Sequence, residues 1–555
     1  MTSPTDEQKA AIDLFTGGGS LRIDAYAGTG KTTTLRYLAQ STQHRGHYLA
    51  FNKKIATHAE EIFPKSVRCS TYHSVAYGAI RTRYGGNNDK MAGNANAILI
   101  GDVLGLPEYT QFSEQFALSK RSYGAVLKGA MRRFLYSEDD VPLAKHFPRT
   151  GRLAALDRDQ FSHVTSTALN PLRQLWEEMQ SFDSRMPLGH DGYVKLWSLS
   201  NPRFHADYVM LDEAQDSNPV LLRVLRQQSC QMVYVGDPYQ QIYEWRGAVN
   251  AMEHVATDHR THLTQSFRFG NAIADEATKV ISRLGATAAL RGTPSITSHI
   301  CPVHPQTILC RTNAGVMSNL VTHQNNNART HVVGGTKELE ILLDNVKRLK
   351  RGIPSELPEF YGFANWQEVV EHVEQENDQG LRLLVKLVTQ YGEDRLLQAL
   401  RNCVDSEEKA QIIVSTAHKA KGCEWDVVQI DRDFDAAFMK QEKTDDTDNL
   451  KWDVDAEGRL FYVAMTRAKA AVELPPAAML FFGITNSRSE HFGTPYVPDS
   501  RPAGLSTAAG SRFPLARPQA PPNPPAQPSH SAPSTKSQSP NDNVVSRIFR
   551  ALLGK

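Results

Sequence analysis

A glycine-rich turn between two periodic segments constrains the fold of this chain most strongly. Residues 21–25 form a short β-like run, and a helical pattern of apolar residues starts near Lys31. Between them, positions 25–32 read AYAGTGKT, which fits the phosphate loop G-x-x-x-x-G-K-[ST] except that Ala25 replaces the first glycine. Backbone N–H groups of such a loop, and the N-terminus of the helix after it, bind phosphate groups. The predicted phosphate-binding residues are Ala27, Gly28, Thr29, Gly30, Lys31, Thr32 and Thr33.

Further short apolar runs alternate with helical segments along the chain, in two sets. Those of the first set lie at 48–51, 208–211 and 232–235, and those of the second at 307–310, 412–415 and 427–430. Alternation of short apolar strands with helices predicts parallel α/β sheets. We therefore expect an α/β protein with two parallel-sheet domains, the first of which carries the phosphate loop.

Two stretches interrupt the α/β alternation with mostly helical patterns. The predicted boundaries are 1–88 and 206–262 for the first α/β domain, 89–205 for its helical insertion, 263–337 and 408–490 for the second α/β domain, and 338–407 for its small helical insertion. The acidic segment 441–457 is expected to be a surface loop.

The composition changes sharply after residue 498. Pro, Ala, Ser and Gln dominate residues 498–543, which cannot bury enough apolar area to offset their ordering entropy, so we predict a disordered linker. Residues 544–555 carry a helical stripe of apolar side chains and are predicted to form a short amphipathic helix. Three interpretations of that helix stay open: it binds a protein partner, lies on an anionic membrane, or folds back onto its own chain.

Composition excludes several classes of protein. The 555 residues carry a formal charge of +2, which is inconsistent with a strongly basic nucleic-acid coat but allows a local basic groove. No apolar run approaches the ~20 residues that span a bilayer. The first residues lack a secretory leader pattern, and the six scattered cysteines form no CxxC pair, so a reduced, cytoplasmic protein is expected. Cys301, His304 and Cys310 lack an obvious fourth ligand, and no metal site is predicted there.

An acidic pair follows the β-like run 208–211. Asp212 and Glu213 at the end of an apolar strand fit a Walker B element. Asp212 is expected to hold Mg²⁺ together with Thr32, and Glu213 to orient and activate the attacking water. Lys31 would reach the β- and γ-phosphates of ATP. An isolated acidic pair also fits a helix N-cap, but the phosphate loop upstream favours the catalytic interpretation.

The chain resembles superfamily 1A helicases, the UvrD, Rep and PcrA group, across about residues 5–475. The segments that carry the resemblance occur in the order of the family's motifs: 5–8 (TDEQ), 49–53 (LAFNK), 71–74 (TYHS), 212–216 (DEAQD), 235–248 (VGDPYQQIYEWRGA), 263–268 (LTQSFR), 309–313 (LCRTN), 415–424 (STAHKAKGCE) and 460–469 (LFYVAMTRAK). The resemblance implies two RecA-like domains, with ATP bound between them.

The resemblance also implies roles for individual residues around ATP. Gln8 would read the adenine edge and Phe267 would stack on the base. Gln240 would sense the γ-phosphate, and Glu424 would bind the ribose. Arg268 and Arg467 resemble the family's two arginine fingers, and Arg246 is expected near the phosphates. These groups would position and neutralise the phosphoryl group in transfer.

A single strand of DNA would lie across both domains. Base stacking on aromatic side chains is sequence-tolerant, which suits a translocase. The predicted DNA-binding residues are Phe51, Asn52, Thr71, His73, Tyr243, Trp245, Thr416 and His418. The family implies movement from 3′ to 5′, and the expected partners are single-stranded DNA and junctions of single- and double-stranded DNA.

Within the family, the residues of segments 49–53 and 235–248 resemble those of the F-box DNA helicase branch. Since the first motif starts near residue 5, no F-box is expected here, and no ubiquitin-ligase function is carried over. Three functions stay open: a helicase that unwinds duplexes in repair, recombination or replication; a translocase that strips proteins from single strands; and an ATP-dependent module that recruits a partner in a plasmid, phage or defence system. An RNA substrate is a further alternative, because the sequence does not indicate whether the site discriminates against a 2′-hydroxyl.

Overall fold

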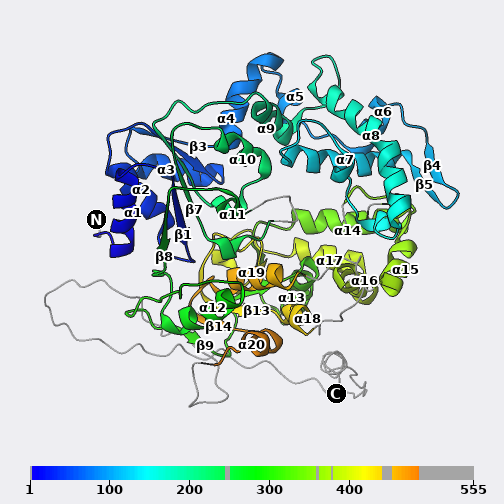
Figure 1. Ribbon diagram of the computed structural model, residues 1–555. Coiled ribbons are helices and arrows are strands. Elements are labelled where there is room, and N and C mark those ends of the chain that lie inside the picture. Colours follow the sequence, from blue (N-terminus) through cyan, green and yellow to red (C-terminus); the bar gives the residue numbers. More distant parts are fainter. Residues whose placement is uncertain are drawn as a thin grey trace, which may run out of the picture. The chain divides into compact units, whose positions relative to one another are not determined.

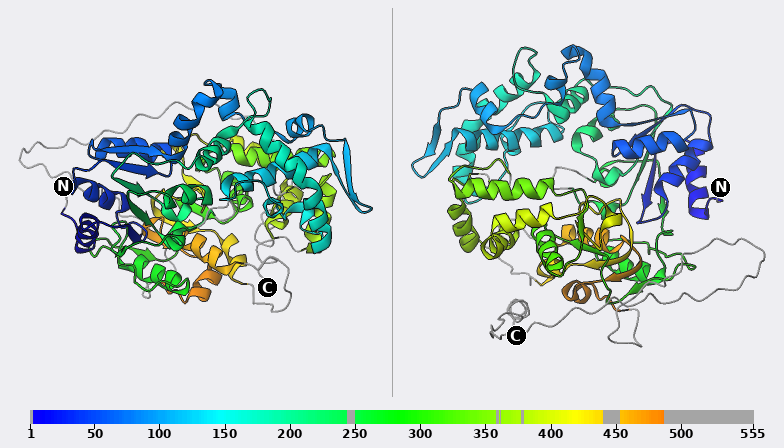
Figure 2. Two further views of the ribbon diagram at one scale, coloured as in Figure 1. Left: turned by 45° about the horizontal axis from the view of Figure 1, so that its top comes forward. Right: turned by 180° about the vertical axis from the view of Figure 1, so that it is seen from behind.

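The computed structural model describes residues 3–243, 250–357, 360, 362–376, 379–439 and 453–486. The chain divides into two units, Met1–Pro498 and Asp499–Lys555, and the second lies outside the described residues. The linker predicted at 498–543 and the helix predicted at 544–555 therefore also lie outside them. Figure 1 labels the helices and strands, and Figure 2 shows them from two further sides.

The first sheet has six parallel strands in the order β3-β2-β6-β7-β1-β8. Its strands are β1 Leu21–Ala25, β2 Gly46–Ala50, β3 Val67–Thr71, β6 Tyr208–Leu211, β7 Gln231–Gly236 and β8 His259–Leu263. The central strands are buried along most of their length, as expected for a parallel sheet covered by helices. The prediction of a parallel α/β sheet is confirmed.

Helices precede or follow the strands of this sheet along the chain. They are α1 Asp6–Thr16, α2 Lys31–Gln40, α3 Lys53–Ile62, α4 Tyr72–Ile80, α10 Pro219–Arg226 and α11 Ala251–His254. The start of α1 is fixed by a capping box, in which the Gln8 N–H donates to Thr5 Oγ1 at 3.3 Å and the Thr5 N–H donates to Gln8 Oε1 at 3.0 Å. The cap also holds the Gln8 amide in one orientation.

The second sheet also has six parallel strands, in the order β11-β12-β10-β13-β14-β9. Its strands are β9 His299–Ile300, β10 Thr307–Cys310, β11 Thr330–Val332, β12 Ile412–Thr416, β13 Trp425–Ile430 and β14 Ala468–Glu473. The helices that accompany it are α12 Asn271–Arg283, α13 Asn313–Asn325, α18 Asp435–Phe438, α19 Val454–Met465 and α20 Pro476–Phe482. The second predicted parallel sheet is confirmed.

Helical segments lie between strands of each sheet. Those between α4 and β6, here called the first insertion, are α5 Asn88–Ala92, α6 Ala97–Val103, α7 Lys120–Tyr136, α8 Arg158–Gln180 and α9 Gly189–Leu199. Those between β11 and β12, the second insertion, are α14 Lys337–Lys350, α15 Trp366–Glu376, α16 Gln379–Tyr391 and α17 Glu393–Arg401. The first insertion also contains an antiparallel hairpin, β4 Tyr109–Ser113 and β5 Phe116–Ser119, where a mostly helical segment was expected.

The acidic segment 441–457 is not a loop throughout. Residues 441–452 lie outside the described part, but α19 begins at Val454, with Asp453 Oδ1 accepting the Ala456 N–H at 3.0 Å as its N-cap. Acidic residues in this first turn are favoured by the partial positive charge of a helix N-terminus, and a charge count alone does not register that effect. Among the described residues, no helix combines the length and apolarity needed to cross a membrane.

Candidate nucleotide site and DNA track

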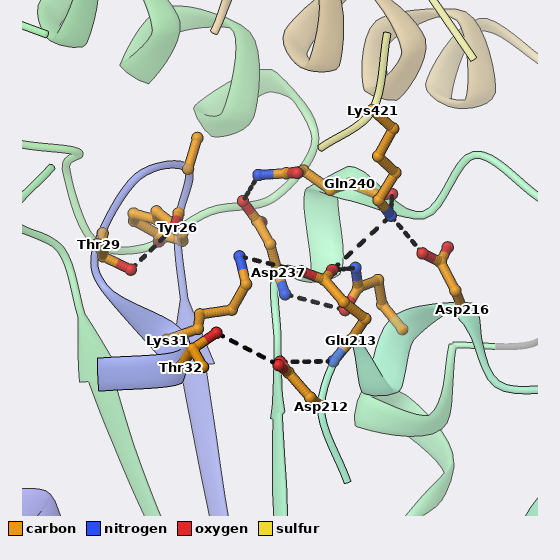
Figure 3. A network of polar contacts seen from close by, with 12 residues as sticks. Tyr26, Thr29, Lys31, Thr32, Asp212, Glu213, Asp216, Asp237, Gln240 and Lys421 are labelled. Carbon is orange, nitrogen blue, oxygen red and sulfur yellow. Dashed lines mark hydrogen bonds and ion pairs between the residues drawn. The ribbon is translucent and has the colours of Figure 1, made fainter. Parts of the chain in front are cut away.

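The predicted phosphate loop forms the turn between β1 and α2 (Figure 3). Gly28 and Gly30 have φ of 74° and 76°, a left-handed conformation that favours glycine. A Cβ at Gly28 would lie 2.5 Å from Ser266 Oγ, so space also requires glycine there. Gly30 is the N-cap of α2 and gives that end no side-chain cap, which leaves the first turn, including Thr32 and Thr33, suited to an anion.

The backbone N–H of Ala27 in the phosphate loop is hydrogen-bonded to a side chain from the second sheet's part of the chain. It donates to the Tyr462 hydroxyl at 3.2 Å, and that hydroxyl donates to Asp237 Oδ2 at 3.2 Å. Thr29 Oγ1 turns back to donate to the Tyr26 carbonyl at 2.9 Å. The second-sheet helix α19, which carries Tyr462, therefore contacts the loop directly.

Asp212 and Glu213 follow β6 and lie opposite the start of α2. Thr32 Oγ1 lies 3.5 Å from Asp212 Oδ2, and the Tyr48 hydroxyl donates to the same oxygen at 2.6 Å. Lys31 Nζ lies 3.7 Å from Glu213 Oε1. Glu213 has a φ of 52°, a conformation that is costly for a residue with a Cβ and is found preferentially at functional sites.

The two carboxylates differ in their pKa. Burial and the adjacent Glu213 charge raise the pKa of Asp212 to about 6. Burial alone would also raise the pKa of Glu213, but the charges of Lys31 and Lys421 and a hydrogen bond from Gln215 lower it to about 2. Glu213 is therefore ionised at neutral pH, and a further positive charge beside Asp212 would stabilise its ionised form.

The oxygen atoms of Thr32 and Asp212 fit a magnesium ion. A hydroxyl and a carboxylate are hard oxygen ligands, which Mg²⁺ prefers, and Asp212 is a buried acid that lacks a cation of its own within ion-pair distance among the described residues. Another group of residues, Cys310, Asp431 and Asp433, also has its ligand atoms close together. There, however, Asp433 accepts the N–H groups of Arg311 and Thr312 at 2.8 and 2.9 Å, which accounts for its position.

Cations from the second sheet's part of the chain reach this site. Arg467, with 2% of its surface exposed, points Nη2 to Gln240 Oε1 at 3.4 Å. Burial and then the Arg268 charge lower the pKa of Arg467 to about 9. Arg268 donates from Nε to Glu424 at 2.8 Å and from Nη1 to the Thr466 carbonyl at 2.8 Å. The two predicted fingers therefore lie in one neighbourhood, although Arg268 is held by Glu424 here.

The structure adds residues that the sequence reasoning did not select. Lys421 Nζ donates to the Asp216 carboxylate and to the Gln240 carbonyl, the latter at 2.8 Å (Figure 3). Asp237 accepts from Gln240 Nε2 at 2.7 Å, and burial raises its pKa to about 6. Lys421, Asp216 and Asp237 all lie inside motif-like segments, so charged residues within those segments were the available signal.

The residues expected to bind the base lie beside the loop. Gln8 Nε2 donates to Thr34 Oγ1 at 3.1 Å, and the Gln8 amide retains one N–H and one lone pair beyond these contacts. Phe267 is 49% exposed, and its ring lies 3.6 Å from the position of a Cβ at Gly30. Arg246, also expected near the phosphates, lies outside the described residues.

Three predicted DNA-binding residues lie together. The rings of Phe51 and Tyr243 stack with their centroids 6.2 Å apart, and Phe51 is 43% exposed. The Tyr243 hydroxyl donates to the His418 carbonyl at 3.2 Å. Trp245 lies outside the described residues. The aromatic pair therefore connects β2 of the first sheet with the segment after β12 of the second.

The other predicted DNA-binding residues have local contacts. Asn52 and Thr71 are N-caps, whose side-chain oxygens accept the N–H groups of Ile55 at 2.9 Å and Ser74 at 3.2 Å. Thr416 Oγ1 accepts the Lys419 N–H at 3.3 Å. His73 Nε2 lies 3.8 Å from Asp191 in α9 of the first insertion. These side chains have structural contacts, and their DNA contacts remain predictions.

Two parallel sheets that share one phosphate-loop site define the P-loop nucleotide-binding class. Residues 190–258 match the family model of the UvrD/REP helicase N-terminal domain, and residues 318–474 match that of the UvrD-like helicase C-terminal domain. Two stretches of the chain thus match the two domains of UvrD-like helicases, in line with the resemblance to superfamily 1A, and the chain is similar to F-box DNA helicases.

Two curated relatives are similar over most of the chain. F-box DNA helicase protein 1 of Schizosaccharomyces pombe is 29% identical over 507 residues, which are 84% of this chain and 56% of that protein. F-box DNA helicase 1 of Gallus gallus is 27% identical over 513 residues, which are 84% of this chain and 48% of that protein. The chain thus spans about half the length of the curated relatives that it matches.

Proposed function

We propose that this chain is an ATP-dependent DNA helicase and translocase that moves from 3′ to 5′ on single-stranded DNA and couples ATP hydrolysis to duplex unwinding. The observation that carries the proposal is the composite site, in which the phosphate loop and Glu213 lie beside Arg467 and Lys421 from the second sheet's part of the chain. The matches to the two family models and the names of the two relatives support it. The direction rests on the resemblance to the family.

The side chains suit the hydrolysis of ATP. Glu213, whose pKa is lowered to about 2, is ionised at neutral pH and would orient the attacking water. Lys31 would contact the phosphates, and Arg268 and Arg467 would neutralise the charge that spreads over the transferred phosphoryl group. Mg²⁺ held by Thr32 and Asp212 would contribute further charge neutralisation at the phosphates.

The two sheets contribute different parts of the site, which gives hydrolysis a mechanical outcome. ATP would bind most tightly when the groups of both sheets surround it, so its loss shifts the equilibrium between closed and open arrangements. Tyr243 stacks beside Phe51 and lies 5.6 Å from Lys421 Nζ, so the predicted DNA track and the acidic site share neighbouring residues. We infer that closure changes the grip on DNA through these contacts.

The expected partners are single-stranded DNA and junctions of single- and double-stranded DNA, and the expected setting is DNA repair, recombination or replication. A protein partner for residues 544–555 is part of the proposal, although these residues lie outside the described part of the chain. A cytoplasmic location likewise remains a prediction from the composition.

The first test is steady-state ATPase activity with and without single-stranded DNA. We expect strong stimulation by DNA, and a loss of at least about a hundredfold in turnover for Glu213→Gln, because a positioned general base contributes that much or more. Lys31→Ala is the blank, and Lys65→Ala, which removes an exposed lysine before β3, is the matched control. Turnover of Glu213→Gln at the wild-type rate contradicts the assigned base.

Strand displacement then separates the remaining alternatives. Unwinding of duplexes with 3′ tails, but not with 5′ tails, supports the proposed helicase. Clearance of a bound protein from single strands without unwinding supports the stripping translocase instead. ATPase activity that is indifferent to DNA contradicts the DNA track and favours the partner-recruiting module.

A further inference from the structure

Glu7, in the first turn of α1, contacts the segment that joins the two sheets. Residues 264–268, here called the crossing segment, follow Leu263 at the end of β8 and precede α12. The Thr264 N–H donates to Glu7 Oε2 at 2.8 Å, and the Thr264 hydroxyl donates to Oε1 at 2.6 Å. One carboxylate therefore fixes the start of the crossing segment against α1.

A residue beyond α12 completes the same contact. Arg291 Nη2 donates to Glu7 Oε1 at 2.6 Å, and Arg291 Nε donates to Thr264 Oγ1 at 3.1 Å. The backbones pair as well, with the Arg291 N–H donating to the Thr264 carbonyl at 2.9 Å and the Ser266 N–H donating to the Arg291 carbonyl at 2.7 Å. Glu7 thus connects α1 both to the crossing segment and to Arg291.

The crossing segment also contacts the phosphate loop and carries two predicted site residues. The Phe267 N–H donates to the Gly28 carbonyl at 2.8 Å. Phe267 is the expected partner of the base, and Arg268, next along the chain, is an expected finger. Because these side chains project from adjacent positions, a shift of the segment relative to α1 moves both of them.

We propose that Glu7 is a positioning residue for ATP: by holding the crossing segment against α1, it sets the placement of Phe267 and Arg268 relative to Gln8 and the phosphate loop. The charges alone do not explain the contact, because Arg291 is 57% exposed and an exposed ion pair contributes little stability. The hydrogen-bond geometry explains the contact, since the same carboxylate accepts a backbone N–H and a hydroxyl of the crossing segment. The inference rests on the proposed ATPase activity.

The experiment compares KM and kcat for ATP in Glu7→Gln and Glu7→Ala. Removing the carboxylate leaves the Thr264 N–H without its acceptor, so we expect Glu7→Ala to raise KM about tenfold and to lower kcat by a smaller factor. Glu7→Gln retains an oxygen acceptor for Thr264 and should lie between Glu7→Ala and wild type. Asp6→Ala is the matched control, because Asp6 neighbours Glu7 and its exposed side chain pairs with Lys9 within α1.

A second readout separates positioning from folding. Binding of a fluorescent ATP analogue should weaken in the order wild type, Glu7→Gln, Glu7→Ala, while thermal unfolding of Glu7→Gln stays at the wild-type temperature. Arg291→Gln should weaken binding in the same direction, and adding it to Glu7→Ala should cause less loss than the two separate effects combined, because the two residues share one contact.

Each outcome decides a different point. Unchanged nucleotide binding and unchanged KM in both Glu7 variants overturn the positioning role, as does an equal rise in KM for Asp6→Ala. If wild-type protein binds the analogue but hydrolyses no ATP, the proposed function fails, and the order of analogue affinities still decides the role of Glu7.

Discussion

The Lys421 ammonium donates to the Asp216 carboxylate, joining the segment after β12 of the second sheet to the segment after β6 of the first. The same ammonium lies 5.6 Å from the centroid of the Tyr243 ring. Burial raises the pKa of Asp216 to about 6, although Lys421 opposes this shift. One lysine therefore contacts the acidic site on one side and an aromatic residue of the predicted DNA track on the other.

Lys421→Met should reduce the DNA-stimulated ATPase activity more than the basal ATPase activity. We expect the stimulation of ATPase activity by single-stranded DNA to fall about tenfold, with a smaller change in basal activity, because a charge-assisted contact between the two sites is lost. ATPase titrations with single-stranded DNA measure both quantities. Lys419→Met is the control, since Lys419 pairs with the exposed Glu338 at 2.9 Å, and equal loss in both variants would contradict a specific role for Lys421.

Tyr243→Ala should weaken the binding of single-stranded DNA. Stacking on one base contributes ~1–3 kcal/mol, so the Kd should rise about tenfold to a hundredfold, while Tyr243→Phe, which keeps the ring, should stay near wild type. Fluorescence anisotropy of a labelled oligonucleotide measures the Kd. Tyr109→Ala, which removes a 74% exposed ring of the β4–β5 hairpin, should leave it unchanged. Wild-type affinity in Tyr243→Ala would remove this residue from the DNA track.

His47 should make stability fall in mild acid. Burial, and then the Arg68 charge, lower the pKa of His47 from its ordinary 6.5 to about 4. The unfolded chain therefore binds a proton near pH 6.5 that the folded chain binds only near pH 4. The contribution of His47 to the free energy of unfolding is fully present above pH 6.5 and is lost as pH falls toward 4. At pH 5 the loss from this residue is about 2 kcal/mol.

Urea unfolding at pH 7.5 and pH 5 measures this contribution. His47→Gln, which can still bond to Ser70, should lose about 2 kcal/mol less than wild type between the two values. His44→Gln removes a 75% exposed imidazole and should behave as wild type. An identical pH dependence for wild type and His47→Gln would show that His47 titrates normally in the folded chain.

Glu356→Ala should loosen the contact between the two insertions. Glu356 Oε2 accepts the Ala97 N–H at the start of α6 at 3.1 Å, Oε1 lies 2.9 Å from Arg121 Nη2, and Lys128 lies 3.6 Å away. With three partners and 20% exposure, the carboxylate should contribute about 1–2 kcal/mol to the free energy of unfolding.

Hydrogen exchange tests the same contact locally. The Ala97 amide should exchange faster in Glu356→Ala, while Glu108→Ala, which removes an 84% exposed carboxylate, should leave its exchange unchanged. Unchanged protection of Ala97 in Glu356→Ala would mean that α6 and the second insertion are held together by other contacts.

Local sequence determined much of the fold. The strands β1, β6 and β10 have the predicted bounds. Buried strands of a parallel sheet are short continuous apolar runs, and this pattern differs clearly from that of the flanking helices. The edge strands β3 and β8 were missed, since their outer positions include Arg68, Arg260 and other polar residues. The β4–β5 hairpin was missed for a similar reason, as its exposed face is polar within a helical segment.

The sequence by itself also determined the chemical groups of the site, because the phosphate loop and the acidic pair are each a short motif whose residues are consecutive in the chain. Only the tertiary structure decided which distant residues meet. Lys421 and Asp216 are 205 positions apart, and Thr264 and Glu7 are 257 apart. Such contacts depend on strand order and on the crossing between the sheets, which are set by long-range packing and leave no periodic trace in the local sequence.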